Sequence, residues 1–368
     1  MSKAAELAAL ISSQSALSDR NLIINGAMQV AQRGTSFSYA HDGTTNAFNL
    51  DRFSFQFASS ENFDCTIAQV SDGPSGFSSS LKITTGTAES AVASDEYYVL
   101  VQSIEAQNLQ KLSYGASSAK ITTLSFYVKS SLTGTFGLSL YLQDDVRIIN
   151  KTYTIDSANT WERKTINVVG DTTGVIDNDN GGGMYIYWNF GAGSDYDGAS
   201  TATTWENYTT TNFMDSSSSD ALVTTAGATW QMTGVQFELG EQATPFEHRS
   251  FGDELRRCQR YYYKITPGDT GGVGTGIHNA TSQATIFIPY QVAMREGPTA
   301  VETSSTATDF DIRNNNGIIQ LDSVPVFQSA TRHGAEVLCN HSGSPTQGEA
   351  TTLRFRTTSD FIAWSAEI

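Results

Sequence analysis

Cysteine, proline and basic residues are scarce in this 368-residue chain. The three cysteines, Cys65, Cys258 and Cys339, lie far apart and are odd in number, and none belongs to a C-x-x-C pair. This pattern predicts neither a disulfide framework nor a zinc site, and it favours synthesis in a reducing cytoplasm.

Positive charge is also in short supply, with 22 lysines and arginines against 38 acidic residues and a net charge of −16. Binding to nucleic acid or to anionic lipid needs a basic surface, so both partners are disfavoured. No apolar run is long enough to span a membrane. The opening M-S-K-A-A-E-L-A-A-L contains Glu6 and lacks the apolar core of a signal peptide, so we expect no secretion by that route.

Catalytic and metal-binding motifs are missing as well. There is no G-x-S-x-G elbow, Walker A loop or Rossmann fingerprint, and the five histidines show no H-x-x-x-H spacing. Asp171, Asp177 and Asp179 offer hard oxygen ligands of the kind calcium prefers, but the run lacks the EF-hand glutamate and reads better as a solvated acidic turn. The sequence therefore predicts no metal, no cofactor and no enzymatic activity.

Alternating short strands are abundant over residues 21–245, and turn-rich stretches separate them. In L-S-F-Y-V-K, G-L-S-L-Y-L-Q and M-Y-I-Y-W-N-F, every second residue is apolar. Further strands are expected at residues 53–57, 81–84, 98–101, 165–169 and 235–239. Short strands without intervening helices predict an all-β domain, a jelly-roll β-sandwich.

Residues 265–368 repeat this style and predict a second, smaller β-domain. Strand candidates are T-I-F-I-P-Y, G-I-I-Q-L, A-E-V-L-C, T-L-R-F-R and the closing F-I-A-W-S-A-E-I. The N-N-G at residues 315–317 predicts a hairpin. We expect no helix in this region.

Two short helices complete the expected architecture. Residues 2–17 place Leu7, Leu10, Gln14 and Leu17 at spacings of three and four, with Ile11 beside them, a coiled-coil rhythm too short to be stable alone. We expect this helix to pack against its own copies or into a socket on a larger assembly. A second helix is expected near residues 250–264. Ser250 and Asp253 begin it, and one face holds Phe251, Leu255, Cys258 and Tyr262.

Tyrosines mark the polar faces of three predicted strands: Tyr127, Tyr141, Tyr185 and Tyr187. If these strands are neighbours, their rings form an amphipathic platform on which sugars can stack, as in jelly-roll carbohydrate-binding modules, to which the domain is similar in plan. The alternative is a subunit interface, where tyrosine is also enriched. A following loop adds further candidates for recognition: Asp195, Tyr196, Trp205 and Tyr208.

Two longer motifs carry a family resemblance. N-L-I-I-N-G-A-M-Q-V-A-Q-R-G-T-S at residues 21–36 and V-Q-F-E-L-G-E-Q-A-T-P-F-E-H-R-S-F-G-D-E-L-R-R-C-Q-R-Y-Y-Y-K at residues 235–264 resemble tail-fibre and related virion proteins of tailed, marine podovirus-like bacteriophages. The segments S-A-N-T-W-E-R-K-T-I and G-A-G-S-D-Y also fit. The resemblance covers about residues 21–264.

The resemblance implies a non-enzymatic virion protein, a homotrimeric tail fibre made in the host cytoplasm. Residues 1–20 would dock on other tail or virion proteins, residues 21–249 form the jelly roll, residues 250–264 link the domains, and residues 265–368 contact a host polysaccharide or receptor. A head-decoration or connector protein and a glycan-cleaving depolymerase remain as alternatives.

Overall fold

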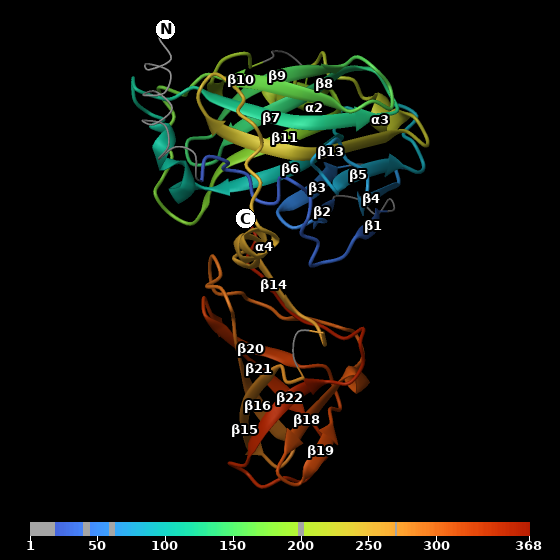
Figure 1. The fold of residues 1–368 in the computed structure, drawn as a ribbon, viewed down its shortest axis with the longest axis vertical. Helices are drawn as coiled ribbons and strands as arrows, with labels where there is room; N and C mark the ends of the chain where they lie inside the picture. The colour runs from blue at the N-terminus through green and yellow to red at the C-terminus, as the bar shows by residue number, and fades with distance from the viewer. Residues whose placement is uncertain (1–18, 40–44, 59–62, 198–201, 269–270) are drawn as a thin grey trace. The chain divides into compact units, whose positions relative to one another are not determined.

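The computed structural model describes residues 19–39, 45–58, 63–197, 202–268 and 271–368 (Figure 1). The chain forms two compact units, residues 1–254 together with Ile368 and residues 255–367, which we call the sandwich domain and the C-terminal domain. The expected N-terminal helix, with its docking candidates Leu7, Leu10, Ile11, Gln14 and Leu17, lies outside the described residues. None of the described helices is long and apolar enough to cross a bilayer.

Two antiparallel sheets build the sandwich domain, as the alternating sequence predicts. The first sheet has the order β1 (Ser36–Tyr39), β4 (Cys65–Val70), β5 (Ser80–Thr85), β13 (Thr229–Leu239), β7 (Thr122–Ser130) and β10 (Glu162–Val168). The second has the order β12 (Glu206–Asn207), β9 (Arg147–Ile155), β8 (Gly134–Leu142), β11 (Gly182–Ala192), β6 (Tyr97–Glu105), β3 (Phe53–Ala58) and β2 (Thr45–Phe48). This is a jelly-roll β-sandwich.

The core of the sandwich domain lies between these two sheets. Trp188 of β11 is fully buried there, and its ring centroid lies 6.2 Å from that of Phe53 and 6.0 Å from that of Phe126 on the opposite sheet. Alternation along each strand sends every second side chain inward, and the others point to solvent or to covering segments. Short helical pieces connect the strands: η2 (Ala106–Leu112), α2 (Ser194–Asp197), η3 (Thr210–Asn212) and α3 (Ala221–Thr224).

Strand β13 contains a bulge at Gly234, whose φ of +64° suits glycine. The register shifts between Thr233 and Gln236 at this point. Val235 and Phe237 alternate along the strand predicted at residues 235–239 and are buried, whereas Leu239, next in the same alternation, is exposed at the strand end.

The C-terminal domain has a core of its own and is again all-β. Its large sheet has the order β19 (Gly317–Gln320), β18 (Phe310–Asn314), β22 (Ala350–Phe355), β15 (Gly274–Ala280), β16 (Gln283–Pro289), β21 (Gly334–Asn340) and β20 (Val326–Thr331). A small sheet has the order β14 (Tyr262–Ile265), β23 (Ile362–Ser365) and β17 (Glu302–Thr303). Asn314 pairs with Gly317, which confirms the predicted hairpin. One 3-10 turn, η4 (Ala307–Asp309), departs from the expectation of no helix.

Helix α4 (Phe251–Gln259) is shorter than the linking helix that was predicted. Ser250 caps it as expected, because its hydroxyl accepts a hydrogen bond from the Asp253 amide at 3.2 Å. The prediction was wrong for Tyr262, which lies in β14 opposite Ser365, and for Phe251, which is exposed. Helix α4 does not continue to Tyr262 because the chain there pairs as strand β14 with the distant strand β23.

Candidate functional site

The outer face of the second sheet carries tyrosines on adjacent strands. Tyr185 of β11 lies opposite Tyr141 of β8, and Tyr187 lies opposite Val101 of β6. The intervening Ile186 points into the core, so the alternation of β11 separates an apolar inner row from this aromatic outer row.

A segment of the same chain, residues 193–197 and 202–219, covers part of this face, and we call it the cover segment. Its anchor is Phe213, whose backbone oxygen accepts a hydrogen bond from the Ser139 hydroxyl at 2.7 Å. The Asn150 amide donates to the Asn212 backbone oxygen at 3.0 Å, and the Met214 amide donates to the Tyr196 oxygen at 3.0 Å. A second, small core forms beneath it from Val99, Val101, Ile148, Ala202, Phe213 and Met214.

The tip of the cover segment is held by a reciprocal cap at η3. The Asn212 side chain accepts a hydrogen bond from the Thr209 amide at 2.8 Å, and the Thr209 side chain caps the Asn212 amide in return. The amide group of Asn212 also donates to Glu206 at 2.9 Å. These bonds fix the backbone that presents Phe213 to the sheet.

Between the sheet and the cover segment lies a groove of about 390 Å³, which we call the tyrosine groove. Its lining residues are Gln56, Tyr97, Tyr141, Tyr187, Tyr196, Tyr208, Thr210 and Phe213. Neighbouring rings meet edge to face. The ring centroids of Tyr187 and Phe213 are 5.0 Å apart, and those of Tyr141 and Tyr208 are 5.2 Å apart. Such contacts hold the rings in fixed orientations.

Among the residues that the structure describes, no carboxylate, amine or guanidinium lines the tyrosine groove. Burial raises the pKa of Tyr141 and Tyr208, and it raises that of Tyr187 most strongly. The phenols therefore stay neutral at physiological pH, and each O–H can donate one hydrogen bond and accept others. The groove combines aromatic faces with uncharged polar groups.

The structure brings together five of the eight predicted site residues. Tyr141, Tyr187, Tyr196 and Tyr208 line the groove, and Tyr185 stacks on Tyr187 with ring planes 17° apart.

Three predicted residues lie elsewhere. Tyr127 is on β7, which belongs to the first sheet, so the condition that the tyrosine strands be neighbours holds for β8 and β11 and not for β7. The ring of Tyr127 packs on Phe77, with ring centroids 5.5 Å apart. Trp205 donates its indole N–H to the Val169 oxygen at 2.6 Å, a structural contact. Asp195 is exposed beside the groove without lining it.

Four lining residues were not predicted from the sequence: Gln56, Tyr97, Thr210 and Phe213. Tyr97 precedes a predicted strand and follows its alternation, so extending that strand by one residue would have found it. Phe213 lies in irregular backbone, where no periodicity marks it.

The acidic turn has a structural role at Asp171. This buried carboxylate forms an ion pair with the Arg147 guanidinium and accepts a hydrogen bond from the Thr173 amide at 2.9 Å. Among the described residues, no group of three or more histidines, cysteines or acidic residues has a metal-binding arrangement.

The two long sequence motifs meet in space, which sequence reasoning did not predict. Residues 21–26 run beside β13, where the Asn21 amide group donates to the Val235 oxygen at 3.1 Å and the Phe237 amide donates to the Asn21 side chain at 3.0 Å. Gly26 is required here, since a Cβ would lie 2.2 Å from the Val235 oxygen.

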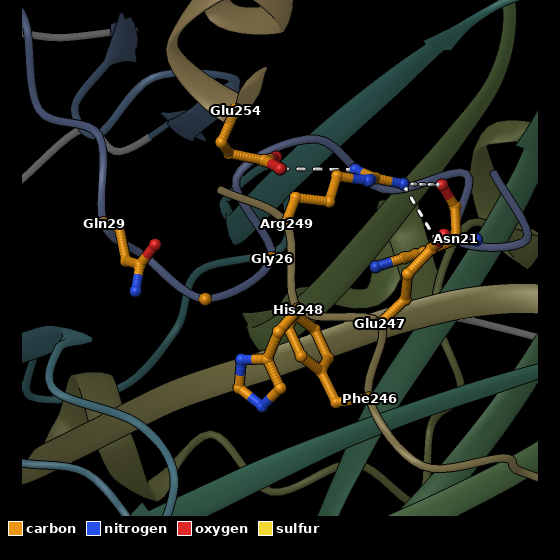
Figure 2. Close-up of a pocket in the computed structure, with 9 residues that line it drawn as sticks. Asn21, Gly26, Gln29, Phe246, Glu247, His248, Arg249 and Glu254 are labelled. Atoms are coloured by element: carbon orange, nitrogen blue, oxygen red, sulfur yellow. Dashed lines mark hydrogen bonds and ion pairs between the residues drawn. The ribbon is translucent and has the colours of Figure 1, made fainter. Parts of the chain in front are cut away.

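Three charged residues hold the segment of residues 21–26: Glu247, Arg249 and Glu254. We call them the arginine clamp. Figure 2 shows Arg249 between Glu254 and the backbone of Asn21. Its guanidinium donates to the Ile23 oxygen at 3.0 Å and lies 3.4 Å from Glu254. Glu247 accepts hydrogen bonds from the amides of residues 19 and 21, both at 2.8 Å. The adjoining pocket has a volume of about 10 Å³, room for one water, so these motifs serve the fold rather than a ligand.

No family model and no curated protein matches the sequence. Among solved structures, the enzymatically active domain of bacteriophage CBA120 tailspike protein 4 aligns with 60% of this chain at 13% identity and a TM-score of 0.32, although the alignment covers only 21% of the tailspike chain.

Carbohydrate-binding modules align over nearly their full lengths. The family 11 module of a Clostridium thermocellum cellulosomal cellulase aligns at 12% identity and a TM-score of 0.28, over 60% of this chain and 96% of the module. A xylan-binding module from Paenibacillus barcinonensis aligns at 11% identity and a TM-score of 0.27, over 61% and 96%. Identities and TM-scores this low assign no function to the chain.

Proposed function

We propose that this chain is a non-enzymatic, glycan-binding protein of a bacteriophage virion, and that the tyrosine groove binds neutral sugar units of the host surface. The observation that carries the glycan assignment is the composition of the groove, six aromatic rings with one amide and one hydroxyl side chain and no charge.

Neutral sugars suit this lining for two reasons. The C–H faces of a pyranose ring pack on aromatic rings, and its hydroxyls exchange hydrogen bonds with neutral phenols and amides. An acidic sugar would bring a carboxylate into a site without a cation, in a protein of net charge −16, and would bear an uncompensated desolvation cost. The groove volume is near the lower end of the roughly 300–1,000 Å³ of ligand pockets, which suits one or two sugar rings.

The same residues support binding without cleavage in this proposal. Hydrolysis of a glycosidic bond commonly uses two carboxyl groups, about 5 to 10 Å apart, on either side of the bond. The groove lining contains none.

The virion assignment rests on the resemblance of residues 21–36 and 235–264 to tail-fibre proteins. In this proposal the protein is a homotrimeric tail fibre that docks on the particle through residues 1–20. Several copies on one particle would convert weak sugar contacts into firm attachment through avidity.

The test is sugar binding by the full chain and by matched tyrosine variants. A panel of immobilised neutral and acidic oligosaccharides selects a ligand, and calorimetry then measures its affinity. Tyr141→Ala and Tyr208→Ala should each weaken binding about 10-fold or more, since a buried aromatic contact contributes on the order of 1–2 kcal/mol.

Tyr127→Ala is the matched control, because this half-buried tyrosine lies on the other sheet. It should leave the affinity unchanged. A wild-type chain that binds no neutral oligosaccharide, or a Tyr127→Ala variant as impaired as the groove variants, would refute the assignment of this groove.

A further inference from the structure

The outer face of the large C-terminal sheet exposes bulky apolar side chains. Ile277 is 52% exposed, Phe287 47%, Ile318 60% and Val326 46%. These four are the large, exposed apolar residues of the described part of this domain, and they come from four different strands.

Strand register places all four on one face. Cross-strand partners share a face of a sheet, and so do residues two apart on one strand. One row of partners crosses five strands: Val326, Leu338, Thr285, Ile277 and Ala350. The next row crosses six: Ile318, Arg313, Thr352, Thr275, Phe287 and Glu336.

The domain does not need this face for its own core. The opposite face of the same sheet holds the fully buried Ile286, Val337 and Leu353. Ile277 and Phe287 lie on the adjacent central strands β15 and β16, and Ile318 and Val326 lie on the two edge strands. Single exposed apolar residues are ordinary on protein surfaces, whereas apolar side chains exposed across a whole sheet face are typical of a protein contact.

Charge on this face is balanced, unlike the acidic chain as a whole. A third row of partners holds Asp311 and Arg354, whose charged groups lie 4.0 Å apart. The second row has Arg313 near one end and Glu336 at the other, with Thr352, Thr275 and Phe287 between them. Arg313 is exposed and Glu336 is half-buried, and within the described chain neither forms an ion pair. Opposite charges at the two ends of one face let each end contact the opposite end of another copy, in a two-fold pair or head to tail around a three-fold ring.

We infer that this face is the contact between copies of the chain, with Arg313 of one copy against Glu336 of the next, and with Ile277 and Phe287 between them. A second copy fits better than an unrelated partner because the charges of the face complement each other. The inference rests on the proposed trimer and names the surface that would form it.

The experiment is the solution mass of the full chain by light scattering. The wild-type protein should have a mass that is a multiple of the 39.7 kDa of one chain. That mass should be three times the mass of one chain if the proposed trimer is correct. Ile277→Asp and Arg313→Glu should each shift the mass towards one chain. The double variant R313E/E336R should restore the wild-type mass, because it exchanges the two charges without changing the apolar rows.

Val146→Asp is the matched control, an equally exposed valine of the sandwich domain at 46%, and it should leave the mass unchanged. Circular dichroism shows whether each variant remains folded. An assembly of two chains that responds to these variants would support the face and refute the trimer. A wild-type monomer, an assembly insensitive to Ile277→Asp, or a double variant that stays dissociated would overturn the inference. Sugar binding by the groove is measured separately, so either proposal can fail alone.

Discussion

The two domains differ in what covers the outer face of a seven-stranded sheet. In the sandwich domain, the cover segment lies over the sheet and leaves a groove of defined shape. In the C-terminal domain, the corresponding face keeps Ile277, Phe287 and Ile318 about half exposed. A face covered by its own chain can hold a small ligand, because its side chains are fixed before binding. A bare apolar face is suited to another protein surface, which buries it on assembly.

The largest expected effect comes from removing the anchor of the cover segment. Phe213→Ala should lower the free energy of unfolding of the sandwich domain by about 3–5 kcal/mol, because it empties the small core between cover and sheet. It should also abolish sugar binding. Urea unfolding measures the first effect and calorimetry the second. Phe251→Ala, at an exposed phenylalanine of α4, should change stability by less than about 0.5 kcal/mol. Equal losses in both variants would contradict the role given to Phe213.

Removing the clamp arginine should have the next largest effect. Arg249→Ala leaves Glu254 and the Ile23 oxygen without the guanidinium that satisfies them, which should cost about 2–4 kcal/mol of unfolding free energy. The control is Arg163→Ala, whose guanidinium makes an exposed contact to the Thr244 oxygen. Hydrogen exchange at residues 21–26 should rise in Arg249→Ala and not in the control. Unchanged exchange there would show that the clamp does not hold this segment.

The pH dependence of stability should distinguish the C-terminal domain from the sandwich domain. His278 and His341 are buried in the C-terminal domain with ring nitrogens 3.2 Å apart. Burial lowers the pKa of both rings, and His278 lowers that of His341 further; Glu349 and Asp322 oppose these shifts.

The unfolded chain, with a histidine pKa of about 6.5, therefore binds more protons than the folded domain below that pH. Stability of the C-terminal domain should fall as the pH drops through about 6.5 towards the lowered folded-state values. Hydrogen exchange followed by mass spectrometry at pH 7.5 and 5.5 measures the stability of each domain separately. His341→Asn should flatten this dependence, while His333→Asn, at an exposed histidine, should not. A wild-type C-terminal domain equally stable at both pH values would refute the prediction.

The smallest effect is expected at the tip of the cover segment. Asn212→Ala removes one half of the reciprocal cap and the bond to Glu206, which should cost about 1–2 kcal/mol. Sugar affinity should fall several-fold, since the backbone on either side of Phe213 loosens. Thr160→Ala, which removes an exposed local contact, serves as the control for both measurements. Full affinity in Asn212→Ala would mean that the cap does not shape the groove.

Sequence reasoning recovered the architecture because alternation is a local signal. Trp188 and Phe190 could be assigned to the core from the strand that contains them. The partner of a strand is not local information, so nothing in L-S-F-Y-V-K could show that Tyr127 faces away from Tyr141. Tyr262 illustrates the same limit: it continues the helical spacing of Leu255 and Cys258, yet pairing with Ser365 makes it part of a strand.

The candidate site was harder to predict, since half of its lining comes from the cover segment and Tyr97 lies at the start of a strand. Phe213 occupies a turn-rich stretch whose composition suggests only a loop. Its importance follows from the Ser139 hydrogen bond and the rings around it, which long-range folding alone brings together.

The arginine clamp has an evolutionary consequence. It closes the sandwich domain with residues from that domain's own two ends, 19–26 and 247–254, so every bond of the clamp is complete by Glu254. A recombination event downstream of this codon would exchange the C-terminal domain without disturbing a single clamp contact. The C-terminal domain can thus be exchanged while the sandwich domain keeps the contacts that close it.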